Sequence, residues 1–312
     1  MSKAQRATID ALIRQSPFDG SLPPEQLRED FEIQMTSGPA PAGVIVTPSV
    51  LGGRPALTVE PEGGSAAGTI LYFHGGGWVF GSPATALNLT AALVRRTGLR
   101  AASVDYRLAP EHPFPAALED GTAAYRDLLD QGVPAERIVL AGESAGGGLS
   151  VTALLAAREA GLPMPAAAVA FSPVLDASLS GGSMTAKNDA DPLFTRADLA
   201  TVFVHYLAGQ DPDQALLSPA LHGDLTGLPP LLLQAGSNEV LLDDSTRFAA
   251  RAAAAGVDVR LDITADVPHV FQAFEGLLDE AEAALDRAAR FITDVLANRS
   301  ADRLGRVAAL VG

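Results

Sequence analysis

Cysteine is absent from the 312-residue chain. Its absence excludes disulfide bonds, thiolate–metal sites and a cysteine nucleophile. Positive charge is also scarce, because 22 Lys and Arg residues stand against 37 Asp and Glu residues and leave a formal net charge of −15. Such a chain repels the phosphate backbone of nucleic acids. We therefore expect no nucleic-acid partner, and we interpret the negative charge as a contribution to solubility.

Long apolar runs are absent as well. No uncharged apolar stretch reaches the roughly 18 residues needed to cross a bilayer. The first residues, MSKAQRATIDALIRQ, are amphipathic rather than continuously apolar, so no signal peptide is visible. A content of 47% hydrophobic and 19% charged residues is typical of a soluble globular protein with a large core. We expect a cytoplasmic enzyme or binding protein that has no membrane partner.

From about residue 43 onward, short β-rich segments alternate with helical segments rich in Ala and Leu. This alternation predicts a mostly parallel sheet of about eight strands with helices on both faces. A hairpin around Gly52-Gly53 is expected to add antiparallel pairing at one edge. Strands are expected within residues 43–50, 54–61, 69–77, 100–108, 137–144, 166–175, 229–237 and 257–263. Helices are expected near residues 84–97, 116–131, 146–160, 242–255 and 279–298.

Two segments interrupt this alternation. Residues 1–40 carry apolar side chains at helical spacing before any strand, and residues 177–225 separate two strands by far more than one crossover needs. We expect both segments to fold together as a helical cap over the carboxyl ends of the strands, where open α/β sheets bind ligands. The catalytic core would then comprise residues 41–176 and 226–312. The alternative is that both segments are peripheral decoration.

The sequence GESAGG, at residues 142–147, follows the apolar run RIVLA. The segment therefore predicts a strand, a sharp turn and a helix, which is the context of a nucleophile elbow. Such a turn forces Ser144 into a strained backbone conformation. Gly142 and Gly146 flank it because side chains there would clash with the neighbouring strand and helix. A plain glycine-rich turn is the alternative interpretation.

A second glycine cluster, HGGGW at residues 74–78, comes just after another expected strand. Glycines leave backbone N–H groups free to point at a substrate oxygen, and two or three such donors make an oxyanion hole. A phosphate cradle is the rival use, but neither of the glycine-rich phosphate-binding motifs is present. His74 itself is expected to brace the loop by hydrogen bonding rather than to act as a base.

Together with these two motifs, the sequence resembles the bacterial hormone-sensitive-lipase-type esterases of the α/β-hydrolase superfamily. The resemblance implies an α/β-hydrolase fold and carboxylic-ester hydrolysis through a serine acyl-enzyme, with no cofactor and no metal. Since members of the family often dimerise, a homodimer is also expected. The matching pieces are HGGGW (74–78), DYRLAPEHPFPAALED (105–120), GESAGG (142–147), DPLF (191–194), EVLLDDS (239–245) and PHVF (268–271).

The base is expected to be His269, because the triad partners of this fold follow the nucleophile in the order serine, acid, histidine. This order removes two of the five histidines, His74 and His112. His205 and His222 fall in the expected cap. His269 instead follows the expected strand at 257–263 and a short loop, which suits a base lowered onto the sheet edge.

Three carboxylates compete for the role of the acid: Glu239, Asp243 and Asp244. The acid must reach the histidine from a loop directly after a strand, which favours the first of them. Many relatives carry an aspartate followed by PLRDE here, and this pattern also places the acid at Glu239. Asp243 and Asp244 are interpreted as charges at a helix start, near the positive end of its dipole.

The predicted mechanism is serine ester hydrolysis. His269, oriented by Glu239, takes the Ser144 proton as the oxygen attacks the ester carbonyl, and water later hydrolyses the acyl-enzyme. The oxyanion is expected to bind the backbone N–H groups of Gly75, Gly76 and Ala145. The segment YRLAPEHPFP is expected to brace this loop, with the Glu111 carboxylate bonding to backbone.

The substrate is expected to be a small ester with a short acyl chain of about four to six carbons, because a cap over aromatic side chains encloses a pocket of limited depth. A lactone or amide hydrolase with the same triad, and a non-catalytic receptor on this fold, remain alternatives. Asp191 either lines the site or makes a structural turn. The candidates for the pocket lining are Trp78, Asp191, Phe194, Phe203 and Tyr206.

Overall fold

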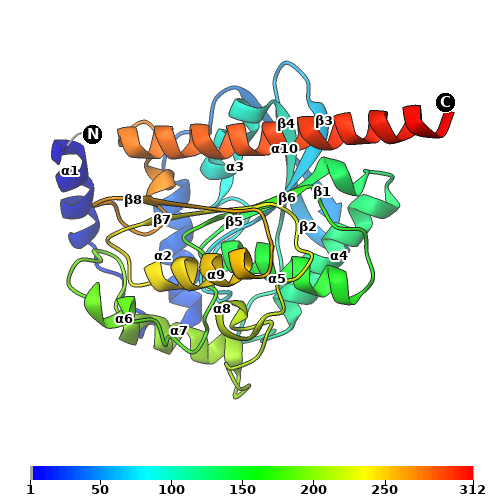
Figure 1. Ribbon diagram of the computed structural model, residues 1–312. Coiled ribbons are helices and arrows are strands. Elements are labelled where there is room, and N and C mark those ends of the chain that lie inside the picture. The colour runs from blue at the N-terminus through cyan, green and yellow to red at the C-terminus, as the bar shows by residue number, and fades with distance from the viewer. Residues whose placement is uncertain (1–2, 312) are drawn as a thin grey trace.

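An eight-stranded sheet forms the centre of the structure, a computed structural model that describes residues 3–311 and side chains up to residue 299 (Figure 1). The strand order is β1-β2-β4-β3-β5-β6-β7-β8. The strands are β1 (Val44–Leu51), β2 (Arg54–Pro61), β3 (Ala66–Phe73), β4 (Leu99–Val104), β5 (Ile138–Glu143), β6 (Ala167–Phe171), β7 (Leu231–Gly236) and β8 (Val259–Thr264).

The pairing confirms the predicted sheet. β4, β3, β5, β6, β7 and β8 are parallel neighbours, and β2 pairs antiparallel with both β1 and β4. The hairpin turn consists of Gly52 and Gly53, whose φ angles of 59° and 76° both lie in the left-handed region. Two consecutive residues at positive φ match the twist of antiparallel strands, and glycine adopts this conformation without steric cost.

Helices cover both faces of the sheet (Figure 1). On one face, α3 and α10 pack against side chains such as Ile70 and Tyr72. On the other face, α4, α5 and α9 pack against Leu71 and Phe73. These helices are α3 (Leu87–Thr97), α4 (Ala116–Asp130), α5 (Ala145–Glu159), α9 (Leu242–Ala254) and α10 (Asp279–Val311).

The central strands β5, β6 and β7 are buried along their whole length. They are therefore almost continuous apolar runs, as strands covered on both faces should be. The final helix was predicted to end near residue 298 but continues to Val311, since the residues beyond it are mostly helix formers without proline. Apart from this end, the predicted alternation of strands and helices is confirmed.

The segments at residues 1–40 and 177–225 contribute further helices. Their described elements are α1 (Lys3–Arg14), α2 (Pro24–Thr36), α6 (Ser183–Ala186), α7 (Arg196–Leu207) and α8 (Pro219–His222). Arg14 donates hydrogen bonds to the carbonyl groups of Asp189 and Ala190, each at 3.3 Å. The rings of Phe18 and Phe194 meet edge to face at 5.0 Å. The two segments therefore touch, although the 136 residues from 41 to 176 separate them in the chain, and in Figure 1 α2, α6 and α7 gather at one end of the molecule.

Candidate active site

Ser144 lies at the sharp turn between β5 and α5. Its φ of 55° and ψ of −121° are strained for a residue with a side chain. A Cβ atom on Gly142 would lie 2.5 Å from the backbone of Gly146, and one on Gly146 would lie 2.1 Å from the carbonyl oxygen of Phe73. The two flanking glycines are thus required by close backbone approach, as the sequence indicated.

His269 and Glu239 form a buried pair. The Nδ1 atom of His269 lies 2.6 Å from Oε2 of Glu239, so the ring donates this proton to the carboxylate. The Nε2 atom of His269 has no hydrogen-bond partner in the described part of the chain. Ser144, Glu239 and His269 follow β5, β7 and β8, which are parallel, so all three residues lie at the carboxyl edge of the sheet.

Ser172, which follows β6, links the loops that carry this pair. Its hydroxyl donates to Oε1 of Glu239 at 3.1 Å and accepts from the N–H of Val270 at 3.0 Å. The N–H of Gly236 also donates to Oε1, at 2.7 Å. Ser172 has a φ of 45°, which is unusual for a serine. The sequence analysis missed this residue, whose only signal was a polar side chain directly after a buried strand.

Asp191 fixes the loop that carries Glu239. Its Oδ2 atom accepts from the N–H of Val240 at 2.8 Å, and its Oδ1 atom accepts from the N–H groups of Leu193 and Phe194 at 2.8 and 3.1 Å. Burial raises the pKa of this carboxyl. Asp191 therefore makes a turn of its own and also holds the residue that follows Glu239.

Asp243 and Asp244 hold a different loop, although both lie in the first turn of α9 as expected. Asp243 accepts from the N–H of Ser183 at 2.9 Å. Asp244 is fully buried and accepts from the N–H groups of Leu175 and Asp176 at 2.7 and 2.9 Å. Of the three competing carboxylates, Glu239 is the one that the structure places on His269.

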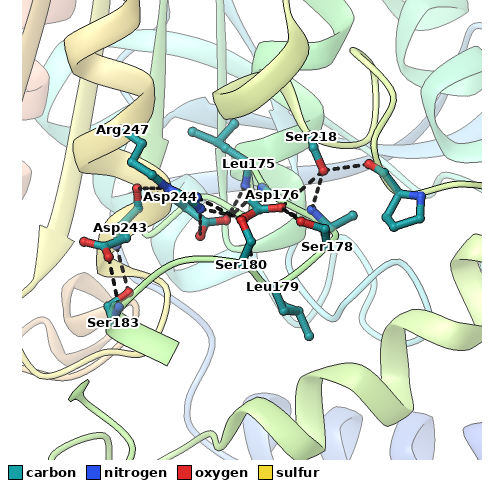
Figure 2. A network of polar contacts seen from close by, with 12 residues as sticks. Leu175, Asp176, Ser178, Leu179, Ser180, Ser183, Ser218, Asp243, Asp244 and Arg247 are labelled. Carbon is teal, nitrogen blue, oxygen red and sulfur yellow. Dashed lines mark hydrogen bonds and ion pairs between the residues drawn. The ribbon is translucent and has the colours of Figure 1, made fainter. Parts of the chain in front are cut away.

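Figure 2 shows how this second loop is held together around Asp176. The Asp176 carboxylate accepts from the hydroxyls of Ser178 at 2.5 Å and Ser180 at 2.7 Å, and from Arg247 of α9 at 2.5 Å. Burial alone would raise the pKa of Asp176, but these hydrogen bonds and the guanidinium lower it to about 2. The network ties α9 to the loop through which the chain leaves β6.

Gly75, the first glycine of HGGGW, does not have the role that the sequence predicted. Its N–H donates to Oε1 of Glu143 at 2.7 Å, so it is not free to bind a substrate oxygen, and the assignment to an oxyanion hole is corrected. The N–H groups of Gly76 and Gly77 donate to no acceptor in the described chain. The N–H of Ala145, at the start of α5, also has no acceptor within its helix.

Gly76 and Gly77 both require glycine. Their φ angles are 112° and 60°. A Cβ atom on Gly76 would lie 2.0 Å from the carbonyl oxygen of Phe80, and one on Gly77 would lie 2.6 Å from Val202. These two N–H groups thus belong to a backbone path that residues with side chains cannot follow.

His74 braces this loop, as expected. The His74 ring stacks on Tyr106 at 4.1 Å, and the Tyr106 hydroxyl donates to the His74 carbonyl oxygen at 2.8 Å. The Nδ1 atom of His74 lies 2.7 Å from the carbonyl oxygen of Gly75. Burial lowers the pKa of His74 to about 4, so the ring is neutral at physiological pH. The N–H of Ala109 further donates to the Trp78 carbonyl oxygen at 2.9 Å.

Arg28 of α2 ties the first segment to the same loop. Its Nε donates to the Val79 carbonyl oxygen at 2.9 Å and its Nη2 to the Ala109 carbonyl oxygen at 2.8 Å. The guanidinium also forms a bidentate pair with Glu111, at 2.7 and 2.6 Å. Glu111 was expected to form hydrogen bonds with the backbone. Instead it binds Arg28, and Arg28 forms the hydrogen bonds with the backbone.

Among the pocket candidates, Trp78, Phe203 and Tyr206 are buried and pack on one another. The Trp78 ring stacks on Tyr206 at 4.3 Å and meets Phe203 at 5.4 Å. A Cβ atom on Gly148, in the first turn of α5, would lie 3.6 Å from the Trp78 ring. This aromatic group therefore connects α7 to the start of the helix that follows Ser144.

Phe194 is the pocket candidate that contacts the pair directly. Its ring meets His269 edge to face at 5.2 Å. Phe18 contacts both Phe194, at 5.0 Å, and Phe80, at 5.8 Å, and Phe31 contacts Phe80 at 5.1 Å. Aromatic side chains from the first segment thus extend up to the ring that covers His269.

The described part of the chain contains neither a cluster of metal ligands nor a helix that could span a membrane. Among the side chains that the structure describes, no group of three or more from His, Asp and Glu is placed so that it could hold a metal ion. None of the helices that the structure describes is both long enough and apolar enough to span a membrane.

Comparison with known proteins identifies the family. The model of the alpha/beta hydrolase fold matches residues 70–273, which is more than half of the chain. The chain belongs to the α/β-hydrolase family. This hydrolase is 47% identical over 224 residues to an acetyl-hydrolase of Streptomyces hygroscopicus, a match that covers 72% of this chain and 75% of the relative. It is 34% identical over 288 residues to an esterase of Acinetobacter venetianus, covering 92% and 94% of the two chains.

A solved structure gives the finer grouping. The crystal structure of a hormone-sensitive lipase from a metagenome library matches this hydrolase with a TM-score of 0.88 and 42% identity, over 93% of this chain and 98% of the other. This hydrolase is therefore a member of the bacterial hormone-sensitive-lipase-type esterases, as its motifs predicted.

Proposed function

We propose that this hydrolase cleaves short-chain carboxylic esters through an acyl-enzyme on Ser144, with His269 as the base and Glu239 as the acid. Its family is one of carboxylic-ester hydrolases, and the chain is one of them. The observation that carries the proposal is the 2.6 Å contact between His269 and Glu239, at the sheet edge where the strained Ser144 also lies. A receptor would have no need of such a pair.

In the first half of the reaction, the Ser144 hydroxyl attacks the ester carbonyl carbon and His269 Nε2 takes its proton. The Glu239 carboxylate keeps the proton of His269 on Nδ1, so that Nε2 presents a lone pair. The imidazolium that results then gives its proton to the leaving alcohol. The unpartnered Nε2 atom is consistent with this direction of proton transfer.

The negative oxygen of the tetrahedral intermediate binds the N–H groups of Gly76, Gly77 and Ala145. These three donors replace the set expected from the sequence, because Glu143 occupies the Gly75 N–H. Removal of one donor from an oxyanion hole costs about 10²–10³ in kcat in other enzymes. In the second half of the reaction, His269 activates a water molecule, which hydrolyses the acyl-enzyme by the same route.

We propose further that residues 1–40 and 177–225 form a cap over this site and limit the acyl chain. Phe18 and Phe194 bring the two segments together, and Phe194 covers the His269 ring. Each acyl methylene that fits contributes about 0.8 kcal/mol, until the chain meets a closed wall. The optimum should lie at about four to six acyl carbons.

The triad is tested with p-nitrophenyl butyrate. Ser144→Ala and His269→Ala should each lower kcat by roughly 10⁴-fold or more with an intact fold, and the double variant should be little worse. Additive losses in the double variant would show that the two residues do not act as a unit. An active Ser144→Ala variant would overturn the proposal.

The substrate class is tested with p-nitrophenyl esters of two to sixteen acyl carbons, alongside lactones and amides of matched size. An optimum at twelve or more carbons would contradict the closed cap. Turnover of lactones above that of every ester would move the substrate to that class while leaving the triad unchanged.

A further inference from the structure

Glu143 is a buried carboxylate whose position the ester mechanism leaves unexplained. It ends β5 and directly precedes Ser144. Its residue is 8% exposed, and its Oε2 atom is buried without a hydrogen-bond partner in the described chain. The buried Tyr72 hydroxyl lies beside it and favours the ionised form of the carboxylate. Burial of a carboxylate is unfavourable, so a residue at this position needs a compensating role.

A backbone hydrogen bond to Glu143 comes from the loop opposite Ser144. Its Oε1 atom binds the N–H of Gly75 at 2.7 Å. The carbonyl oxygen of the same glycine lies 2.7 Å from Nδ1 of His74. Gly75 is therefore held on both its N–H side and its C=O side, and the next two residues in the chain are Gly76 and Gly77.

Gly75 also packs against the nucleophile itself. A Cβ atom added there would lie 3.3 Å from the Ser144 Cβ and 3.4 Å from the Glu143 Cγ. The Gly75 carbonyl and the Gly76 N–H belong to one planar peptide unit, so the contact with His74 restrains the direction of the Gly76 N–H. Glu143 holds the peptide unit just before it, through the Gly75 N–H. Gly76 and Gly77 are free of side chains, so their own φ and ψ angles are weakly restrained unless a neighbour holds them.

We propose that Glu143 is a positioning residue for the oxyanion hole: it holds the Gly75 N–H and thereby aims the N–H groups of Gly76 and Gly77 at the position of the substrate oxygen. This inference rests on the function proposed above. Without an acceptor at residue 143, the Gly75 N–H would be buried and unpaired, and the loop would shift to find another partner. The shift would weaken binding of the tetrahedral intermediate more than binding of the substrate.

Two variants of matched length test the proposal. Glu143→Gln keeps a side-chain oxygen that can accept from the Gly75 N–H, whereas Glu143→Met fills a similar volume and offers no comparable acceptor. Both are compared with the wild type for kcat and KM on p-nitrophenyl butyrate and on its thiono analogue, in which sulfur replaces the carbonyl oxygen. Sulfur accepts hydrogen bonds weakly, so the oxo-to-thiono ratio of kcat/KM reports on the oxyanion hole.

In Glu143→Met, kcat should fall by about 10–100-fold with little change in KM, and the oxo-to-thiono ratio should fall about tenfold. Glu143→Gln should stay within about threefold of the wild type in both quantities. Thermal unfolding and titration of active sites are measured for both variants. Loss of thermal stability alone, with kcat per active site and the ratio unchanged in Glu143→Met, would assign Glu143 a merely structural role and overturn the proposal.

Equal losses in the two variants would also overturn it, because the accepted hydrogen bond would not be what matters. A different result would contradict the proposed ester hydrolysis itself. In that case the wild type would not turn over the oxo ester, or Ser144→Ala would be as active as the wild type. An active, Ser144-dependent wild type with an unchanged ratio in Glu143→Met would reject the role of Glu143 alone.

Discussion

The hydroxyl of Ser172 joins the acid loop to the base loop: it donates to Oε1 of Glu239 at 3.1 Å and accepts from the N–H of Val270, the residue after His269, at 3.0 Å. One side chain directly after β6 thus fixes both partners of the 2.6 Å pair. Glu239 is fully buried, so its carboxylate depends on such donors in place of water.

Replacement of Ser172 should separate activity from stability. Ser172→Ala removes the hydrogen bond to a charged group, worth about 1.5–3 kcal/mol, and should lower kcat about tenfold. Ser172→Gly removes the same hydroxyl, so it should lose a similar amount of activity. Because glycine tolerates the positive φ, its free energy of unfolding should be about 1 kcal/mol higher than that of Ser172→Ala. Urea unfolding and p-nitrophenyl butyrate kinetics measure both. Full activity in either variant would show that the hydroxyl does not orient the acid.

Neutralising Glu239 should lower activity, whereas neutralising Asp243 should mainly lower stability. Glu239→Gln should lower kcat by roughly 10³–10⁴-fold, because a neutral amide does not fix the imidazole tautomer or stabilise its charge. Asp243→Asn should keep most activity and lose some thermal stability, since Asp243 holds the N–H of Ser183 rather than His269. Steady-state kinetics and thermal unfolding of both variants decide the matter. A crippled Asp243→Asn with an active Glu239→Gln would reverse the assignment.

Arg28 should contribute to stability and activity beyond its ion pair. Arg28→Met removes the hydrogen bonds to the carbonyl groups of Val79 and Ala109, and we expect a loss of roughly 2 kcal/mol, or about 5 °C in Tm, with a severalfold lower kcat. Glu111→Gln weakens the half-exposed ion pair but leaves both backbone contacts, so its Tm should fall by less than half as much. Equal effects in the two variants would mean that the ion pair, not the loop contacts, matters.

Glu143 should make the protein less stable as the pH rises. Burial raises its pKa from 4.5 to about 7, with Tyr72, Tyr106 and His269 as the ionisable neighbours. The folded state therefore binds this proton more tightly than the unfolded state, and the stabilisation is present below pH 4.5 and is lost as the pH rises through about 7. The whole change corresponds to roughly 3 kcal/mol.

Urea unfolding at pH 5 and pH 8 measures this linkage. The wild type should lose about 2–3 kcal/mol more than Glu143→Gln over this interval, since the amide does not titrate. The other ionisable groups are common to both proteins and cancel in the difference. Identical pH dependence in the two proteins would show that Glu143 is already ionised at pH 5.

The features that were predicted correctly from the sequence are those that depend on residues close together in the chain. The strand pattern, the hairpin at Gly52-Gly53 and the glycines around Ser144 each follow from the conformations that individual residues allow. The choice of Glu239 over Asp243 required the additional knowledge of where the preceding strand ends. In each case, the deciding constraint lies within a few residues of the feature.

What the sequence could not predict depends on contacts between distant residues. Gly75 and Gly76 look alike in HGGGW, and only the 2.7 Å contact of Gly75 with Glu143, 68 positions away, distinguishes them. Glu111 was assigned to the backbone because its partner Arg28 lies on a helix that carries no motif. Ser172 gave only the signal of a polar side chain after a buried strand, which did not reveal that its hydroxyl acts on loops that follow two other strands.

The first helix has consequences for how the chain is made. Arg14 at the end of α1 contacts Ala190, Phe18 just after the helix contacts Phe194, and Arg6 of α1 pairs with Asp266 at 2.9 Å. A ribosome adds about 5–20 residues per second, so α1 emerges roughly 10–40 s before these partners exist. The residues of α1 that make these contacts must therefore stay unpaired, or be shielded by a chaperone, until residues 190–266 have been made. Although α1 precedes its partners in the chain, it can reach its final place only after they have been synthesised.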